Sequence, residues 1–193
     1  GKYHPRISGQ HTYSYRALSE YEKWCYDRLY NDFFYRRHNE FWYGKAMWKL
    51  PPLLESTSML TCAEDLGMIP DCVPAVMDAL QILALEIQRM PKDPKVEFGN
   101  TWSYPYYSVC TTSTHDMPGI RAWWESDKAM SQRFYNNVLH EGGEAPYFAE
   151  PWICSKIVDL HLTSPAMLCV LPLQDWLSID GQLRRQNPNE ERI

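Results

Sequence analysis

The stretch Met59-Leu60-Thr61-Cys62-Ala63-Glu64-Asp65 joins a short apolar run to two adjacent carboxylates. Three further apolar runs are also followed by polar residues: 81–87 by Gln88-Arg89, 106–110 by residues 111–116, and 166–171 by Gln174-Asp175. Continuous apolar runs of this length are typical of parallel strands that are buried on both faces. The sequence therefore predicts four parallel strands with polar groups at their carboxyl ends.

The spacing of these runs leaves room for a helix between neighbouring strands. The first three begin at residues 59, 82 and 106, and each interval is close to the length of one strand, one helix and their loops. Helical patterns are predicted later in the chain, at residues 120–125, 128–140 and 152–162. Residues 58–177 are therefore expected to form an α/β domain with a parallel sheet.

Two parallel α/β folds fit that order, a (β/α)₈ barrel and a doubly wound open sheet. No glycine-rich turn follows any of the predicted strands, so the dinucleotide-binding fingerprint is missing. Polar and acidic residues close several successive strands instead, and this is where a barrel builds its active site. We therefore expect a barrel, although a complete one takes roughly 250 residues, more than the 193 present.

The sequence pattern changes near residue 58, where the short apolar runs begin. The part before it is predicted to be largely helical, from about residue 15 to residue 50. Its last helix is expected to stop before Pro51-Pro52, because proline lacks the backbone N–H that continues a helix. The expected organisation is a helical segment at 1–57 and the strand-bearing part at 58–193.

The composition argues against several classes of partner. A net charge of −5 disfavours nucleic acid, because phosphate binding requires a basic surface. No apolar run is long enough for a membrane helix, and no signal peptide opens the chain. The six cysteines form no CxxC pair and the histidines are scattered, so we expect no metal site and a cytoplasmic, reducing compartment.

Two strand ends carry groups that can do chemistry. Glu64 is well placed for catalysis at the rigid end of a strand, whereas Asp65 suits a structural role in which it caps the turn or pairs with a nearby base. His115 and Asp116 can hydrogen-bond two adjacent hydroxyls of one ring, or residues 111–116 can be a turn that caps the next helix. A Ser-His-Asp hydrolase is a weaker alternative, because no G-x-S-x-G elbow exists.

Other residues near the strand ends are candidates for substrate contacts. Arg89 and Gln88, which close the second predicted strand, are expected to contact the substrate or Glu64, or to take part in a structural ion pair. Tyr106 and Trp123 are candidates for stacking on a ligand, although we expect most aromatic side chains to fill a core. Asp175 ends the last predicted strand and is a further candidate for the mouth of the barrel.

Two strand-end carboxylates fit the hydrolysis or transfer of glycosides. In that chemistry one carboxylic acid protonates the leaving oxygen, and a second carboxylate attacks or supports the oxocarbenium-like centre. The sequence separates transfer from hydrolysis poorly, because the difference lies in how water is excluded while an acceptor is held. An amylase-type glucan hydrolase and a non-catalytic glucan-binding domain therefore remain alternatives.

Several motifs resemble the 4-α-glucanotransferases of glycoside hydrolase family 77, also called amylomaltases or disproportionating enzymes. The motifs are Ala63-Glu64-Asp65-Leu66-Gly67, Ser113-Thr114-His115-Asp116 and Arg121-Ala122-Trp123-Trp124. Three more stretches resemble the larger, plant-cytosolic type of the family: residues 29–34, residues 87–92 and Pro172-Leu173-Gln174-Asp175-Trp176. The similarity covers essentially the whole chain.

The resemblance implies a retaining transferase that acts on α-1,4-glucans in starch, glycogen or maltose metabolism, without a metal or an organic cofactor. On this pattern Glu64 matches the general acid/base, and Asp116 matches the carboxylate that stabilises the transition state. His115 matches a residue that hydrogen-bonds the sugar in the cleaved subsite. The remaining candidates for substrate binding are Asp65, Arg89, Tyr106 and Trp123.

The chain departs from the family pattern at the nucleophile. The family places an Asp in an Arg-x-Asp-His setting, and these 193 residues contain no such motif. We therefore expect the C-terminal half of the barrel, about strands 5–8, whose partner is the missing N-terminal half. The isolated chain is expected to be inactive, because a retaining mechanism needs its covalent intermediate.

Overall fold

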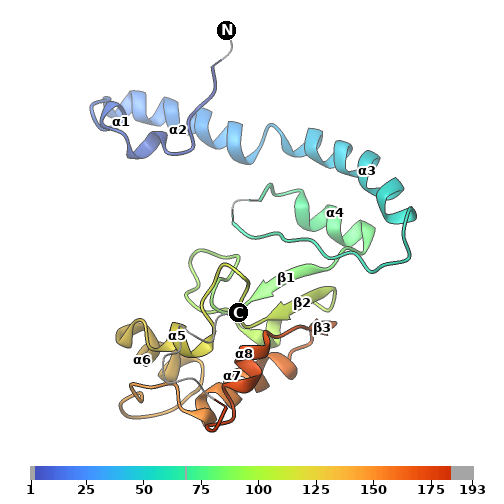
Figure 1. The fold of residues 1–193 in the computed structure, drawn as a ribbon. Coiled ribbons are helices and arrows are strands. Elements are labelled where there is room, and N and C mark those ends of the chain that lie inside the picture. The colour runs from blue at the N-terminus through green and yellow to red at the C-terminus, as the bar shows by residue number, and fades with distance from the viewer. Residues whose placement is uncertain (1–2, 68, 184–193) are drawn as a thin grey trace. The chain divides into compact units, whose positions relative to one another are not determined.

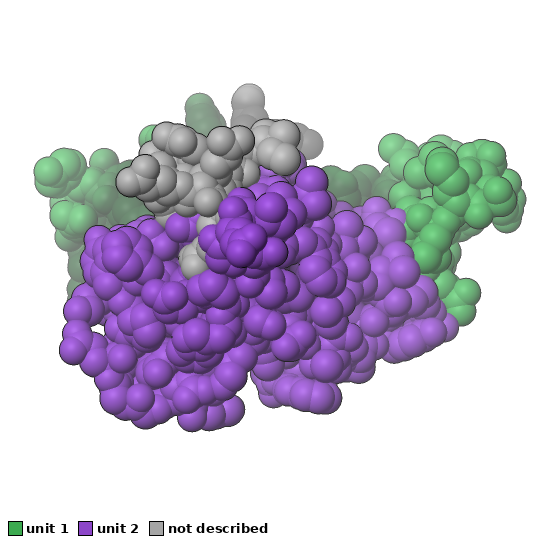
Figure 2. Space-filling model, turned by 60° about the horizontal axis from the view of Figure 1, so that its bottom comes forward, with its two compact units in different colours: residues 1–61, 67–81 green, residues 62–66, 82–193 purple. Residues whose placement is uncertain are grey.

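The computed structural model describes residues 3–67 and 69–183, and Figure 1 shows their ribbon. The chain divides into two compact units, one of residues 1–61 and 67–81, the other of residues 62–66 and 82–193. Figure 2 colours the first unit green and the second purple. Each unit has its own internal packing and is described separately.

The first unit is helical. Its elements are the short 3₁₀ helix η1 (Gly9–His11) and the helices α1 (Tyr13–Arg16), α2 (Glu20–Tyr35), α3 (Asn39–Glu55) and α4 (Val73–Leu80). A capping box starts α2, because the Ser19 side chain accepts from the backbone N–H of Glu22 while the Glu22 side chain accepts from the backbone N–H of Ser19. The helical character predicted for this part of the chain is confirmed.

The irregular segment that precedes η1 packs against aromatic residues of α2. Tyr30 is buried and its hydroxyl donates to the backbone oxygen of Ile7 at 2.8 Å. Gly9 lies so close to Tyr26 that a Cβ at this position would come within 1.9 Å of the Tyr26 hydroxyl oxygen. A side chain at residue 9 would therefore displace the Tyr26 hydroxyl from this approach of the backbone to α2.

The prediction that the helix stops before Pro51-Pro52 is wrong, because α3 continues through both prolines to Glu55. The φ angle of proline is itself helical, so proline interrupts a helix mainly through its missing N–H and through a clash with the preceding turn. Trp48 and Lys49 are exposed on that preceding turn. The prolines remove the N–H partners of the Met47 and Trp48 backbone oxygens, and no residue of α3 is buried, so water can take the place of those partners.

The second unit is built on a parallel sheet, as predicted. The strands β1 (Ala84–Ile87), β2 (Ser108–Thr111) and β3 (Leu168–Cys169) lie in the order β1-β2-β3. In the register of the parallel strands, Ile87 of β1 lies opposite Thr111 of β2, and Cys110 of β2 lies opposite Cys169 of β3. The first apolar run contributes less than a full strand, because only Cys62 forms an isolated parallel bridge, to Leu83.

Helices follow the strands in the order that the sequence predicts. They are η2 (Thr101–Ser103), α5 (Ile120–Trp124), α6 (Lys128–Asn137), α7 (Pro151–Leu162) and α8 (Leu173–Leu177), of which η2 and α8 were not predicted. In Figure 1, α5 to α8 lie together in the yellow-to-red part of the ribbon. Asp127 starts α6 by accepting from the backbone N–H groups of Ala129 and Met130.

The core of the second unit lies among these helices. Ile120, Trp124, Phe134, Ile153 and Ile157 are each at most 2% exposed and belong to one cluster of buried side chains. The α/β class and the parallel sheet are thus confirmed for the described residues. No helix in residues 3–67 or 69–183 has the length and apolar character needed to cross a membrane.

Candidate active site

A buried carboxylate, Asp175, holds the polar segment that follows β2. It is 1% exposed and lies in α8. Its Oδ2 accepts from the hydroxyl of Thr112 at 2.6 Å and from that of Ser113 at 3.3 Å. Its Oδ1 accepts from the backbone N–H of Ile120 at 2.8 Å. Both ends of the loop from residue 112 to residue 120 are therefore tied to one carboxylate.

This arrangement corrects the alternative in which the polar segment caps the next helix. Helix α5 has Gly119 at its N-cap position, without a capping hydrogen bond from a side chain of the loop. Asp175 satisfies the first N–H of α5 from 55 residues further along the chain. A Cβ at Gly119 would lie 2.9 Å from Asp175 Oδ1, so glycine is needed for this close approach.

Arg89 holds the same loop from the end of β1. Its guanidinium donates from Nε and Nη2 to the backbone oxygen of Thr112, at 2.9 and 2.7 Å, and from Nη2 to the backbone oxygen of Pro118 at 2.8 Å. Its Cζ lies 4.9 Å from the ring centroid of Trp123. Burial lowers the pKa of Arg89 to about 10, against the opposing effect of the negative charge on Asp175. The side chain therefore stays charged near neutral pH.

A second group of charges surrounds Lys92. Its Nζ lies 2.6 Å from Asp65 Oδ2 and 2.8 Å from Glu86 Oε1. The other oxygen of Asp65 accepts from the backbone N–H of Leu85 at 2.9 Å. Burial alone would lower the pKa of Lys92, but the hydrogen bonds to Asp65 and Glu86 outweigh it and raise the pKa. The structural role expected for Asp65, pairing with a nearby base, is confirmed.

The two carboxylates predicted to do catalysis are both open to solvent. Glu64 is exposed and precedes the buried Asp65. The side chains of His115 and Asp116 are 88% and 83% exposed, and His115 Nε2 lies 3.2 Å from Asp116 Oδ2. The backbone N–H of Asp116 donates to Thr114 Oγ1 at 3.4 Å. Glu64 thus lies in an exposed segment beside Asp65, whereas His115 and Asp116 lie at the exposed tip of the loop from residue 112 to residue 120, whose base is buried.

The aromatic candidates lie in different places. Trp123 is partly buried and packs edge-on against Phe98 and Phe134. Tyr106 is 63% exposed, but it precedes β2 and so lies at the end of that strand opposite to Asp116. The structure brings Trp123 close to Arg89 and does not bring Tyr106 to the loop that follows β2.

The expectation that most aromatic side chains fill a core is wrong for the described residues. Many are exposed, among them Trp24, Trp48 and Trp102, at 53, 68 and 65%. Aromatic residues make up 14% of the chain. Each of the two compact units is small and buries only a limited fraction of its surface, so neither can enclose all of its aromatic side chains.

Sequence reasoning missed Lys92 and Glu86 and underestimated Asp175. Lys92 reaches Asp65 from 27 residues away, through a loop whose path no local pattern predicts. The one available signal was the acidic residue inside the apolar run 81–87, because a buried carboxylate requires a partner. Within residues 3–67 and 69–183, no three His, Cys, Asp or Glu side chains are grouped so that they could hold a metal ion.

Comparisons with known proteins agree on one family. A sequence profile described as 4-alpha-glucanotransferase matches residues 13–192. The chain is 40% identical over 192 residues to the 4-alpha-glucanotransferase DPE2 of Oryza sativa subsp. japonica, an alignment that covers 100% of this chain and 20% of that protein. It is 27% identical over 157 residues to the 4-alpha-glucanotransferase of Chlamydia muridarum, covering 75% of this chain and 27% of that protein.

A solved structure supports the fold. The amylomaltase from Streptococcus agalactiae in complex with acarbose matches with a TM-score of 0.54 at 16% identity, over 75% of this chain and 28% of that one. At this identity the likeness shows the fold alone, an α/β fold related to the TIM barrel. The chain spans about a fifth to a quarter of the length of these relatives.

Proposed function

The chain belongs to the 4-alpha-glucanotransferase family, and we propose that it takes part in the transfer of α-1,4-glucan segments between maltooligosaccharides or longer glucans. The observation that carries the proposal is the profile match across residues 13–192, which includes both exposed strand-end carboxylates, Glu64 and Asp116. We further propose that the substrates belong to starch, glycogen or maltose metabolism and that the protein acts in the cytoplasm.

In this proposal Glu64 is the general acid/base. It donates a proton to the glycosidic oxygen as that bond breaks, and it later accepts the proton of the incoming 4-hydroxyl group. Asp116 supports the positive charge that develops on the sugar ring, and His115 donates a hydrogen bond to a ring hydroxyl. The exposure of all three side chains supports these roles, because each remains available to a ligand.

The buried residues around them support the same assignment. Arg89 and Asp175 fix the loop that carries His115 and Asp116, so that the sugar meets a preorganised pair of side chains. We propose that Trp123 contacts substrate from the same end of the sheet and that Asp65 supports the site through its pair with Lys92. The exposed ring of Tyr106 stays a candidate for a sugar contact at the other end of β2.

We propose that residues 58–193 correspond to about strands 5–8 of a (β/α)₈ barrel and residues 1–57 to a helical segment of the same catalytic domain. A retaining mechanism also needs a nucleophile, and these residues contain no Arg-x-Asp-His motif. The nucleophile is therefore proposed to come from the other half of the barrel. The 193-residue chain alone is expected to show no transfer.

The experiment that tests the function compares the intact parent protein with its Glu64→Gln variant. Each is incubated with maltotriose, or with maltose and glycogen, and the products are separated by chromatography. We expect the wild type to form a ladder of glucans together with glucose, and Glu64→Gln to form neither. Glu55→Gln, an exposed glutamate at the end of α3, is the matched control and should leave the ladder unchanged.

Two outcomes favour the alternative functions. Release of glucose without a ladder of longer products indicates an amylase-type hydrolase. Unchanged turnover in Glu64→Gln indicates that this carboxylate has no catalytic role and favours a glucan-binding domain. In either case the transferase proposal is overturned for this site.

A further inference from the structure

A pocket of about 420 Å³ lies in the second unit, and its lining includes neither Glu64 nor Asp116. The loop between β1 and η2 forms one wall, and the end of α6 forms the other. Its side chains include Gln88, Phe98, Asn100, Trp102, Asn137 and His140. None of the proposed catalytic or substrate-binding residues lines it.

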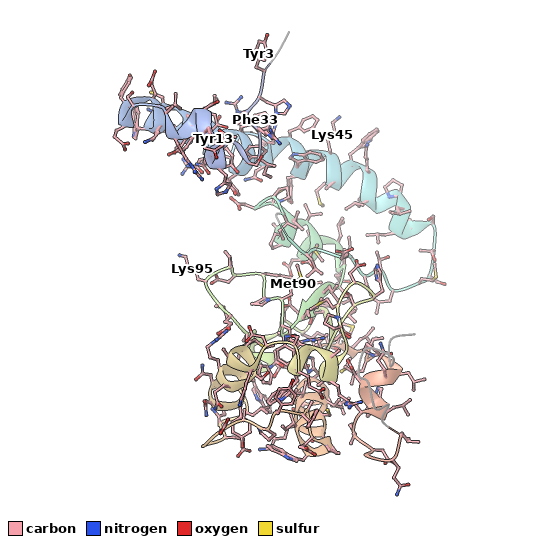
Figure 3. The ribbon with its side chains drawn as sticks, turned by 60° about the vertical axis from the view of Figure 1, so that its left-hand side comes forward. Tyr3, Tyr13, Phe33, Lys45, Met90 and Lys95 are labelled. Carbon is pink, nitrogen blue, oxygen red and sulfur yellow. The ribbon has the colours of Figure 1, made fainter. Side chains whose placement is uncertain are left out.

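The loop that forms the first wall leaves β1 and returns to it. Met90 and Lys95, labelled in Figure 3, lie on this loop. Its end is fixed where the backbone N–H of Gly99 donates to the backbone oxygen of Gln88 at 2.7 Å. Asn100 then starts η2 by accepting from the backbone N–H of Trp102. The wall is therefore held by one backbone hydrogen bond and by the side-chain oxygen of Asn100.

Gln88, one of the residues that line the pocket, has a buried acceptor without a hydrogen-bond partner among the described residues. Its side chain is 1% exposed, and the acceptor is its Oε1. The hydroxyl of Tyr104 is also buried without a partner in the described chain, and it lies 3.6 Å from where a Cβ of Gly99 would stand. Buried polar groups are nearly always hydrogen-bonded, so these two call for a ligand or an ordered water.

The chemistry of the wall selects an uncharged ligand. Its polar side chains are three amides, the hydroxyl of Thr101 and the imidazole of His140, and no Asp, Glu, Lys or Arg is among them. Amides both donate and accept, which suits a ligand rich in hydroxyl groups. Charged ligands would find no counter-charge here and would lose their hydration.

The pocket also offers ring faces. Trp102 is 65% exposed, and Phe98 is partly buried beside it in the lining. Aromatic side chains combine a flat apolar body with a large contact area, which suits the C–H face of a sugar ring. Pockets for small ligands begin at roughly 300 Å³, so this one has room for about one or two sugar rings.

We propose that this pocket binds a neutral sugar of mono- or disaccharide size, as a second carbohydrate site apart from Glu64 and Asp116. Gln88 Oε1 accepts from a sugar hydroxyl, Asn137 closes the opposite wall, and Trp102 covers the ring. The ligand class follows from the lining of the pocket and does not depend on the transfer reaction.

The probe is maltose, titrated into the purified protein by isothermal calorimetry while the indole N–H of Trp102 is followed by NMR. We expect Asn137→Ala and Trp102→Ala each to weaken maltose binding roughly tenfold, since one lost contact of this kind costs about 1.4 kcal/mol. Asn137 and Trp102 are exposed, so neither change removes a core side chain.

The chain offers matched controls for both changes. Asn136 is the neighbouring exposed amide on α6, bonded to Gln132 and to the backbone of Glu141, and it does not line the pocket. Trp176 is an exposed indole on α8, at 43%. Asn136→Ala and Trp176→Ala should change the affinity for maltose by less than about twofold. Mannitol, an open-chain polyol without a ring to stack, should bind much more weakly than maltose.

Three results would overturn the inference. The first is the absence of any shift of the Trp102 indole signal with maltose. The second is equal affinity for mannitol, which would remove the sugar ring from the recognition. The third is loss of maltose binding in Glu64→Gln but not in Asn137→Ala, which would place the sugar at the strand-end carboxylates. Because Glu64→Gln should keep binding here while it abolishes transfer, failure of one proposal is distinguishable from failure of the other.

Discussion

The hydroxyl of Thr112 donates to Oδ2 of Asp175 at 2.6 Å, and both side chains are 1% exposed. The backbone oxygen of the same threonine accepts two hydrogen bonds from Arg89. Thr112 is thus bound on its side chain by an anion and on its backbone by a cation. The loop that begins here carries His115 and Asp116 to the surface, so its geometry depends on residues that do not contact the solvent-facing tip.

Replacing Asp175 should destabilise the protein far more than replacing an exposed aspartate. Asp175→Ala leaves the hydroxyls of Thr112 and Ser113 and the N–H of Ile120 buried without partners. Each unsatisfied buried group costs about 1–3 kcal/mol, so we expect a loss of roughly 3 kcal/mol or more in the free energy of unfolding. Urea denaturation followed by near-ultraviolet circular dichroism measures it.

Asp180→Ala is the control for that experiment, because Asp180 is exposed and accepts only from the backbone N–H of Gln182. It should cost less than about 1 kcal/mol. Equal losses for the two variants would show that Asp175 is not a structural anchor of the loop.

Arg89→Lys should lower the rate of transfer by the intact protein clearly, while it lowers the melting temperature only slightly. Lysine keeps the positive charge, but it cannot present the two nitrogens that reach the oxygens of Thr112 and Pro118. A small displacement of Asp116 would lower kcat by roughly tenfold to a hundredfold. Steady-state kinetics with maltotriose, alongside a thermal melt, separates the two effects.

Arg133→Lys provides the comparison for Arg89, since Arg133 forms an exposed ion pair with Glu97. An exposed pair contributes about 1 kcal/mol or less, so activity should be unchanged. A drop in melting temperature with kcat intact would mean that Arg89 supports the fold and does not position the loop.

The elements that the sequence predicts well are those governed by local rules. The break at Ser126-Asp127 was predicted, and Asp127 indeed caps α6. The order of strands and helices from residue 82 onward follows from apolar runs and their spacing. The role of Asp65, after the first apolar run, was also partly predictable, because it was expected to pair with a base and pairs with Lys92.

Contacts made by distant residues were not predictable in the same way. Asp175 meets Thr112 across 63 positions of sequence, and no periodicity encodes that meeting. The prediction that the helix stops before Pro51-Pro52 failed for a different reason. The local rule that proline ends a helix was overridden, because water has access to the exposed turn. The sequence identifies the exposed residues that can do chemistry. Which buried residues fix their positions depends on how the loops return to the sheet, and that path is not visible in a local pattern.

Lys92→Met should weaken the protein and change its response to alkali. The pKa of Lys92 is raised in the folded state, so its contribution is present below the usual lysine value of about 10.4 and is lost as the pH rises past the folded value. We expect the wild type to lose stability above about pH 10.5 and Lys92→Met to lose less over the same range. Near neutral pH, Lys92→Met should lower the free energy of unfolding by about 1–2 kcal/mol, because Asp65 keeps a buried charge without its partner.

A double-mutant cycle with Asp65→Asn tests the pairing directly. Removing the carboxylate charge should recover part of the loss caused by Lys92→Met, giving a coupling of about 1 kcal/mol. Lys128, whose exposed pair with Glu144 lies on the surface, supplies the control in Lys128→Met. Additive effects of Lys92→Met and Asp65→Asn would show that the two side chains do not stabilise each other.

His161 should make the protein sensitive to mild acid. Burial lowers the pKa of His161, and the bond from its ring to the backbone oxygen of Ile157, which acts in the opposite direction, does not restore it. The folded state therefore binds fewer protons than the unfolded state below about pH 6.5, and the unfolding free energy falls as the pH decreases, by at most about 1.4 kcal/mol per unit for one proton. Urea midpoints measured from pH 7.5 to 5 should decline in the wild type and decline less in His161→Gln. An unchanged slope in His161→Gln would instead assign the acid sensitivity to another group.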